Sequence, residues 1–282
     1  MDEDAVLSNN RLTVPSALKR GANLRPEGED IAADQILYDR GHMLSSLDCA
    51  RLAAGGVEAA QVYAPLRIAI LSSGDEINSG QVLDANRWVL NAVFSGPAFR
   101  VTYAGVVGDD LAETLAALSN LDADLILTSG GVSVGERDVL RLALEAEGDL
   151  NFWRVGIKPG RPVAFGILGG TPFFGLPGNP VACFVTAQFL ARPYAMACLG
   201  AGHDQGWLQV EMATAYKKKT GRTEFVRVHV DADQRARPYA VAGAGILSSL
   251  TQCDGMVRLD DAMTAIDAGT RVPYLPFRGL LT

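Results

Sequence analysis

Three carboxylates of this chain could act together in catalysis or metal binding. Glu76, Asp109 and Asp138 each follow a different predicted strand, and the carboxyl ends of parallel strands meet at the sheet edge where α/β proteins bind ligands. Such a cluster can hold Mg²⁺ through one or two carboxylates and leave its other positions to water and phosphate oxygens. Taken singly, each acid is better explained as a helix cap or a solvated side chain, because Asp109 or Asp110 could cap the next helix and Asp138 could lie in a helical first turn.

A glycine-rich loop leads from the third of these strands to Asp138. Gly130, Gly131 and Gly135 lack a Cβ, so the backbone can approach a ligand closely, and Ser129 and Ser133 supply hydroxyl groups ahead of a predicted helix. The free N–H groups and the dipole at a helix N-terminus attract phosphate and other oxyanions. An ordinary tight turn would use the same glycines. The loop alone leaves both interpretations open.

Three cations, Arg154, Lys158 and Arg161, lie on a segment that proline and glycine stiffen. In an otherwise acidic chain this segment could clamp an anion. By itself it is better explained as a surface hairpin with solvated cations. A further loop, Pro177-Gly178-Asn179-Pro180, follows the last predicted strand of the sheet and is expected at the same edge.

The elements that must position these residues alternate between buried strands and helices. Repeated alternation of this kind predicts an α/β fold with a parallel, doubly wound sheet and right-handed crossovers. The patterns predict strands at 66–71, 100–107, 125–128, 163–167 and 173–176, and helices at 86–94, 111–118, 136–146 and from 180 to about 198.

Two further regions flank this α/β domain. The N-terminal one has too little apolar material to close a core, so we expect that a preceding part is missing; it shows a strand-like run, a helix near 45–54 and a short strand near 57–63. The C-terminal one predicts a small β-barrel or meander from short runs at 208–212, 225–230, 239–241 and 256–259. The predicted domains are a partial N-terminal region at 1–64, the α/β domain at 65–201 and the C-terminal domain at 205–282.

Composition argues against several classes of protein. The formal net charge of −7 over 282 residues disfavours a general nucleic-acid-binding surface. The four cysteines form no CxxC pair, so neither a disulfide framework nor a cysteine metal site is indicated. No stretch approaches the ~20 apolar residues of a membrane span, and the start of the chain is acidic where a signal peptide would be basic. We therefore expect a cytoplasmic protein that binds neither nucleic acid nor membrane.

Six motifs occur in the order and approximate spacing of the molybdopterin molybdenumtransferase family, the bacterial MoeA and gephyrin E-domain group, which the chain closely resembles. The resemblance extends upstream to 23–31 and downstream to 243–250, so it covers nearly the whole chain. The motifs are Ser73-Gly74-Asp75-Glu76, Asp84-Ala85-Asn86-Arg87, Gly108-Asp109-Asp110, Ser129-Gly130-Gly131-Val132-Ser133-Val134-Gly135, Lys158-Pro159-Gly160-Arg161-Pro162 and Gly175-Leu176-Pro177-Gly178-Asn179-Pro180.

The resemblance implies a three-layer molybdopterin-binding domain, an elongated dimerising region before it, and a C-terminal β-barrel domain. Family members are homodimers that take adenylylated molybdopterin and molybdate, hydrolyse the adenylate in a Mg²⁺-dependent step, insert molybdenum and release AMP. By this resemblance Glu76, Asp109 and Asp138 are the expected catalytic and metal-binding acids, and Lys158 is the expected catalytic cation. The expected substrate-binding residues are Ser129, Gly130, Gly131, Ser133, Gly135, Arg154, Arg161, Pro177, Gly178, Asn179, Pro180 and Arg25, the last at the family's dimer-proximal site.

Two other functions are open alongside the transferase. Family members normally carry well over a hundred residues before Arg25, including active-site residues, so this chain could be a molybdopterin-binding remnant without turnover. It could also be a molybdopterin adenylyltransferase, which uses the same α/β domain but is usually a single domain. An adenylyltransferase is otherwise a candidate partner. Arg154 departs from the family, because many relatives have lysine there, and the two side chains differ in donor geometry.

Overall fold

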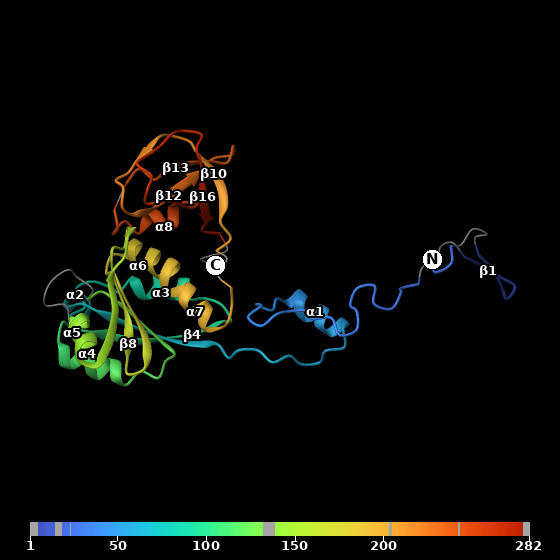
Figure 1. Ribbon diagram of the computed structural model, residues 1–282, viewed down its shortest axis with the longest axis horizontal. Helices are drawn as coiled ribbons and strands as arrows, with labels where there is room; N and C mark the ends of the chain where they lie inside the picture. Colours follow the sequence, from blue (N-terminus) through green and yellow to red (C-terminus); the bar gives the residue numbers. More distant parts are fainter. Residues whose placement is uncertain are drawn as a thin grey trace. The chain divides into compact units, whose positions relative to one another are not determined.

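The computed structural model describes residues 5–14, 19–22, 24–131, 139–202, 205–241 and 243–278. The chain divides into two compact units, Met1–Gln61 and Val62–Thr282 (Figure 1). None of the described residues of the first unit is buried. The expectation that this region cannot close a core alone agrees with that exposure.

The first unit contains a hairpin and one helix. Strands β1 (Val6–Ser8) and β2 (Arg11–Thr13) pair antiparallel, joined by Asn9 and Asn10, both with positive φ, as a tight hairpin turn requires. The predicted helix is present as α1 (Ser46–Ala54), which begins at a capping box formed by Ser45 and Asp48. The strand predicted at 57–63 is wrong: these residues are irregular and exposed, with no neighbouring strand to pair with.

A six-stranded sheet forms the centre of the α/β part of the second unit. Its order is β4-β3-β5-β9-β8-β6. The first four of these strands are parallel to one another. Strand β8 is antiparallel to both of its neighbours, β9 and the edge strand β6. The sheet is therefore parallel-rich rather than wholly parallel. The strands are β3 (Leu66–Ser73), β4 (Phe99–Val107), β5 (Leu125–Ser129), β6 (Gly148–Arg154), β8 (Pro162–Leu168) and β9 (Thr171–Leu176).

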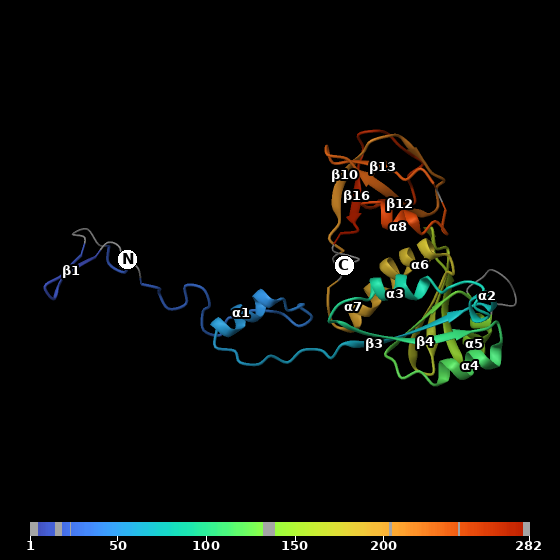
Figure 2. The ribbon, with the colours of Figure 1, turned by 180° about the vertical axis from the view of Figure 1, so that it is seen from behind.

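Helices cover both faces of this sheet, so the α/β part has three layers (Figures 1 and 2). Alternate strand residues supply two separate cores. Ile68 and Ile70 pack with α3 (Asn86–Val93) and with the helix that starts at α6 (Pro180–Thr186), whereas Leu71 packs with α4 (Leu111–Ser119) and α5 (Val139–Glu147). A short helix, α2 (Asp75–Asn78), follows β3.

The long predicted helix runs from Pro180 to Cys198 through a π-helical stretch at Ala187–Ala191 and then α7 (Arg192–Cys198). Contrary to the sequence-based expectation, it is long and apolar enough to cross a membrane by length and composition. Its buried residues, including Val181, Phe184 and Ala195, pack in the hydrophobic core beneath the sheet. Burial on that scale is typical of the core helix of a globular protein.

The C-terminal part is a closed five-stranded barrel. Its sheet order is β13-β10-β16-β14-β12, and the pairing of β13 with β12 closes it. The strand predicted at 239–241 is wrong, because β13 ends at Pro238, and β16 lies outside the predicted strands. The elements are β10 (Leu208–Met212), β11 (Tyr216–Lys217), β12 (Thr223–Val230), β13 (Arg235–Pro238), α8 (Ser248–Gln252), β14 (Gly255–Leu259), β15 (Ala265–Ile266) and β16 (Arg271–Pro276).

A two-residue strand joins the α/β part to the barrel. Strand β7 (Ile157–Lys158) pairs in parallel with β12, with Lys158 opposite Glu224. The amide of Thr223 also donates to the carbonyl of Gly156 at 2.9 Å. Lys158 is therefore part of the barrel sheet. The segment as a whole connects two antiparallel strands, because Arg154 of β6 lies opposite Pro162 of β8, so the predicted surface hairpin is present and also contacts the barrel.

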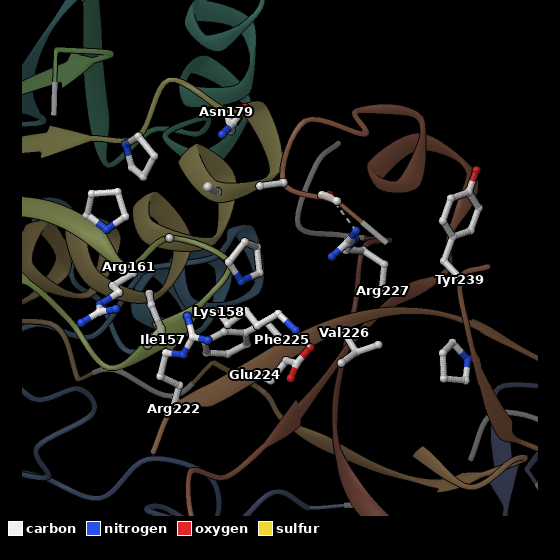
Figure 3. Close-up of a pocket in the computed structure, with 18 of the residues that line it drawn as sticks. Ile157, Lys158, Arg161, Asn179, Arg222, Glu224, Phe225, Val226, Arg227 and Tyr239 are labelled. Atoms are coloured by element: carbon white, nitrogen blue, oxygen red, sulfur yellow. Dashed lines mark hydrogen bonds and ion pairs between the residues drawn. The ribbon is translucent and has the colours of Figure 1, made fainter. Parts of the chain in front are cut away.

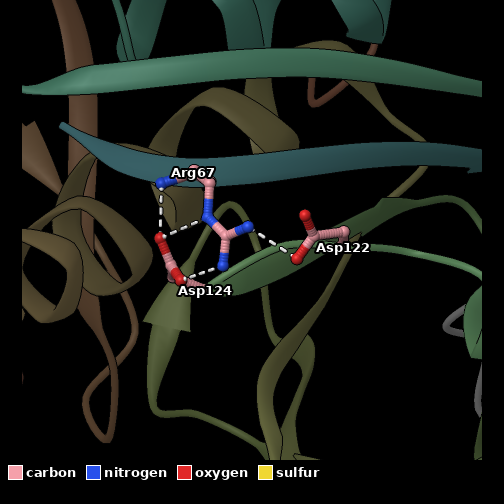
Figure 4. A network of polar contacts seen from close by, with 3 residues as sticks. All are labelled: Arg67, Asp122 and Asp124. Atoms are coloured by element: carbon pink, nitrogen blue, oxygen red, sulfur yellow. Dashed lines mark hydrogen bonds and ion pairs between the residues drawn. The ribbon is translucent and has the colours of Figure 1, made fainter.

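Arg67 lies near the start of β3, at the opposite end of this strand from Glu76, and contacts two aspartates (Figure 4). The guanidinium of Arg67 contacts Asp122 and donates to Asp124 at 2.7 and 3.2 Å, and the Arg67 amide donates to the same carboxylate at 2.9 Å. These bonds lower the pKa of Asp124. The stability they provide is therefore present above the unfolded pKa of an aspartate, about 3.9, and is lost as the pH falls through the lower folded pKa.

We expect Asp124→Asn to lower the melting temperature at pH 7 by no more than about 4 °C, because the pair is partly exposed and screened by solvent. The difference from the wild-type chain should shrink as the pH falls below about 4, because the carboxyl of the unfolded chain then takes up a proton, and it should vanish below the lower pKa of the folded chain. Melting curves from pH 3 to 7 measure this. A difference that persists unchanged at the acid end would contradict the role of the charge.

Candidate active site

The ends of β3 and β4 bring three acids together. Glu76 and Asp75 lie in α2, and Asp109 follows β4; the Asp109 amide donates to Asp75 Oδ1 at 2.9 Å. The pKa of Asp109 is raised, first by partial burial and then by the negative charges of Asp75 and Glu76. The structure therefore places Glu76 and Asp109 in the same electrostatic environment, as the parallel-strand argument predicted, and adds Asp75 to them.

One structural alternative is settled by Asp110. Its carboxylate accepts from the Glu113 amide at 2.8 Å and caps α4, so Asp109 is not the cap. Asp138 lies outside the described residues, together with Ser133 and Gly135. Within the described part of the chain, no group of three His, Cys, Asp or Glu side chains is placed to hold a metal ion. The metal-binding role of these acids stays a prediction.

The glycines after β5 have a packing reason of their own. Gly130 has φ +86°, and a Cβ there would lie 2.2 Å from the carbonyl oxygen of Ser73 on β3. Gly131 has φ +64°, and its Cβ would lie 2.8 Å from Leu140 and 3.0 Å from the Ser73 hydroxyl. Both glycines therefore allow the turn to lie directly against the end of β3. The tight-turn explanation accounts for them, and any contact with phosphate is additional.

We expect Gly130→Ala to lower the free energy of unfolding by about 2–5 kcal/mol, because it combines a strained backbone with a clash against a main-chain oxygen. Gly170→Ala is a matched control, since Gly170 has the same φ of +86° but nothing within 4 Å of its Cβ position. That control should cost only the backbone strain, about 1–2 kcal/mol. Urea unfolding of both variants measures the difference, and equal losses would contradict the close approach to Ser73.

Asn86 connects two of the loops at this edge by hydrogen bonds. Its Nδ2 donates to Ser129 Oγ at 2.6 Å and to the carbonyl oxygen of Gly178 at 2.7 Å. A Cβ on Gly178 would lie 3.6 Å from Gly130 Cα, so the two loops are close. Asn86 is buried, and its Oδ1 has no hydrogen-bond partner among the described residues. The motif around Asp84–Arg87 thus positions the loops after β5 and β9.

A cavity lies beside these loops rather than over the acids. It has a volume of about 370 Å³ and lies between the segment 157–162, the loop 177–179 and the barrel (Figure 3). Pro177 and Asn179 line it, whereas the carbonyl oxygen of Gly178 accepts a hydrogen bond from Asn86, which also donates to Ser129. The loop after β9 therefore borders both the glycine turn and the cavity.

Four cations and one acid line this cavity. The predicted residues Lys158 and Arg161 come from the α/β part, and the barrel adds Arg222, Arg227 and Glu224. Such a concentration of positive charge in a chain with a net charge of −7 favours an anionic ligand.

Arg227 is buried in the cavity wall and has neutral hydrogen-bond acceptors. Its Nε donates to Ser249 Oγ at 3.0 Å and an Nη donates to the carbonyl oxygen of Gly243 at 3.0 Å. Burial lowers the pKa of its guanidinium. Arg227 lies within the predicted strand 225–230 and is not among the predicted site residues. A cation inside an otherwise apolar run, Phe225-Val226-Arg227-Val228, is the sequence signal that could have identified it.

Two of the predicted substrate-binding cations lie elsewhere. Arg154 is exposed at the end of β6 and is not among the residues that line the cavity. Arg25 lies in the first unit, exposed and paired with Glu29 and Asp30 at 3.4 and 3.3 Å. Their substrate-binding roles stay predictions.

The sequence is similar to that of known proteins over nearly the whole chain. Two family descriptions match, "Probable molybdopterin binding domain" over residues 69–197 and "MoeA C-terminal region (domain IV)" over residues 209–277. The molybdopterin molybdenumtransferase of Haemophilus influenzae is 31% identical, in an alignment that covers 100% of this chain and 72% of that protein. This chain belongs to the molybdopterin molybdenumtransferase (MoeA) family.

Other relatives agree with this MoeA assignment. The molybdopterin molybdenumtransferase of Synechococcus elongatus is 28% identical, over 96% of this chain and 70% of its own length. The crystal structure of the molybdopterin biosynthesis MoeA protein from Pyrococcus horikosii superposes with a TM-score of 0.80 at 25% identity, over 98% of this chain and 70% of that one. The MoeA-family chain is thus related to enzymes of molybdenum cofactor biosynthesis.

Proposed function

We propose that this chain inserts molybdate into adenylylated molybdopterin and releases AMP. The observation that carries the proposal is the cation-lined cavity between the Lys158–Pro162 segment and the barrel, because molybdate and phosphate are oxyanions that such a cavity suits. Lys158, Arg161, Arg222 and Arg227 would bind the oxyanion. The loop 177–179 connects this cavity to the edge of the sheet where the acids lie.

The acids would serve the hydrolytic step. Cleaving the adenylate requires an oriented water and neutralised phosphate charge. Asp109 has a raised pKa and lies beside Asp75 and Glu76, so it is the best placed of the three to accept a proton from an attacking water. The hard oxygen donors of Glu76 and Asp109 suit Mg²⁺, and their mutual repulsion would be relieved by a cation. When bound, Mg²⁺ would neutralise phosphate charge.

The family's other properties form part of the same proposal. We expect a cytoplasmic homodimer that receives its adenylylated substrate from a molybdopterin adenylyltransferase. Light scattering at micromolar concentration tests the dimer, and a monomer would count against it. The closed barrel, which matches the C-terminal region of MoeA, supports the transferase over the adenylyltransferase alternative.

The decisive experiment is AMP release by the purified chain from adenylyl-molybdopterin, with molybdate and Mg²⁺. Release that needs both additions would support the transferase. Tight binding of the pterin with no AMP formed would instead favour a non-catalytic molybdopterin-binding protein. Tungstate in place of molybdate tests which oxyanion the chain uses.

A further inference from the structure

The cavity contains a carboxylate that opposes the ligand its cations attract. Glu224 is buried in the cavity wall on β12, directly opposite Lys158 of β7. Its Oε1 accepts from Lys158 Nζ at 2.8 Å and from the hydroxyl of Tyr216 at 2.8 Å. Figure 3 shows Glu224 beside Lys158. No other acid lines the cavity among the described residues.

This placement has an electrostatic consequence for any anion that enters. A negative charge a few ångström from a bound oxyanion repels it, and a partly enclosed cavity weakens solvent screening. The ion pair with Glu224 also neutralises much of the charge of Lys158. This half-exposed cation could otherwise attract the ligand with its full charge. Both effects act in the same direction and weaken the binding of an oxyanion.

We propose that Glu224 limits the affinity of the cavity for oxyanions, so that the bound ion can be exchanged during turnover. This inference rests on the proposed function, because it takes the cavity to be the oxyanion site. It assigns Glu224 a role in setting affinity, with Lys158 as the cation through which part of the effect acts. The carboxylate thus sets how tightly the oxyanion binds and does not itself bind the oxyanion.

The test is titration of the full chain with sodium molybdate at fixed ionic strength by calorimetry. Glu224→Gln keeps an oxygen for Lys158 and Tyr216 but removes the charge, and Glu224→Ala removes both. Glu211→Gln is the matched control, because Glu211 lies on β10 of the same barrel, pairs with Arg271 at the surface and does not line the cavity. It changes the net charge of the chain by the same amount.

We expect both Glu224 variants to bind molybdate about three- to tenfold more tightly than the wild type, as a single nearby charge would produce. Glu211→Gln should stay within about twofold, because its charge is screened. Binding that appears only in the Glu224 variants would also support the proposal. It is overturned if neither variant binds more tightly than Glu211→Gln, if no form binds molybdate, or if both variants fail to fold, which would make Glu224 a structural residue.

The AMP assay separates this inference from the proposed function. If the wild-type chain releases AMP but the Glu224 variants bind molybdate no more tightly, the role of Glu224 is rejected and the transferase proposal stands. If the wild-type chain releases no AMP but the Glu224 variants bind molybdate more tightly, the transferase proposal is rejected and the role of Glu224 stands.

Discussion

Replacing Asp109 with asparagine is expected to lower AMP release by about 100-fold or more, the usual loss when a general base is removed. The change keeps the size of the side chain, and the contact between the Asp109 amide and Asp75 Oδ1 is made by the main chain, so the fold should be kept.

Asp149→Asn is the control for this substitution. Asp149 is exposed at the start of β6, opposite Ile167 and away from the loops that follow β3 and β4. It should release AMP at the wild-type rate, and pterin binding should be similar in all three proteins. An Asp109→Asn variant with a normal rate, or one whose only defect is weaker pterin binding, would exclude Asp109 as the base.

Much of the fold follows from local patterns that are strong in this chain. The run Ile68–Leu71 is apolar and buried on both faces, which identifies β3 as a central strand. Two other strands lack such a signal. Strand β6 follows α5 without a break, and β7 has two residues beside proline and glycine and pairs with the barrel strand β12. Both are fixed by a neighbouring strand, which the sequence does not identify.

The site divides in the same way. Glu76 and Asp109 could be placed together because parallel strands end at a common edge, whereas the barrel's part of the cavity could not be found. In β12, Val226 and Val228 face the barrel core, while Phe225 packs against the α/β part. Period-two alternation separates these two faces but does not say which of them meets another domain. Arg227 therefore lies inside a predicted strand that gave no sign of its place in the cavity, and Glu224 lies just before the predicted start of that strand, within β12.

Replacing Arg227 with methionine is expected to weaken molybdate binding at least tenfold, since a hydrogen bond to a charged ligand contributes about 1.5–3 kcal/mol. Stability should change little. The variant loses bonds to Ser249 and Gly243, but it also removes the cost of burying a guanidinium whose pKa that burial lowers. Wild-type protein should therefore gain melting temperature on addition of molybdate, and the variant should not.

Arg271→Met provides the comparison for Arg227→Met, because Arg271 belongs to the same barrel but is exposed and pairs with Glu211. It should keep the full molybdate-induced shift. Arg227→Lys tests geometry, since an ammonium keeps the charge but not the planar fork, and we expect binding between those of the wild type and Arg227→Met. Equal shifts in all four proteins would mean that the oxyanion does not meet Arg227. The cavity would then lose its strongest claim to the molybdate site, because Arg227 is the buried one of the four cations that line it.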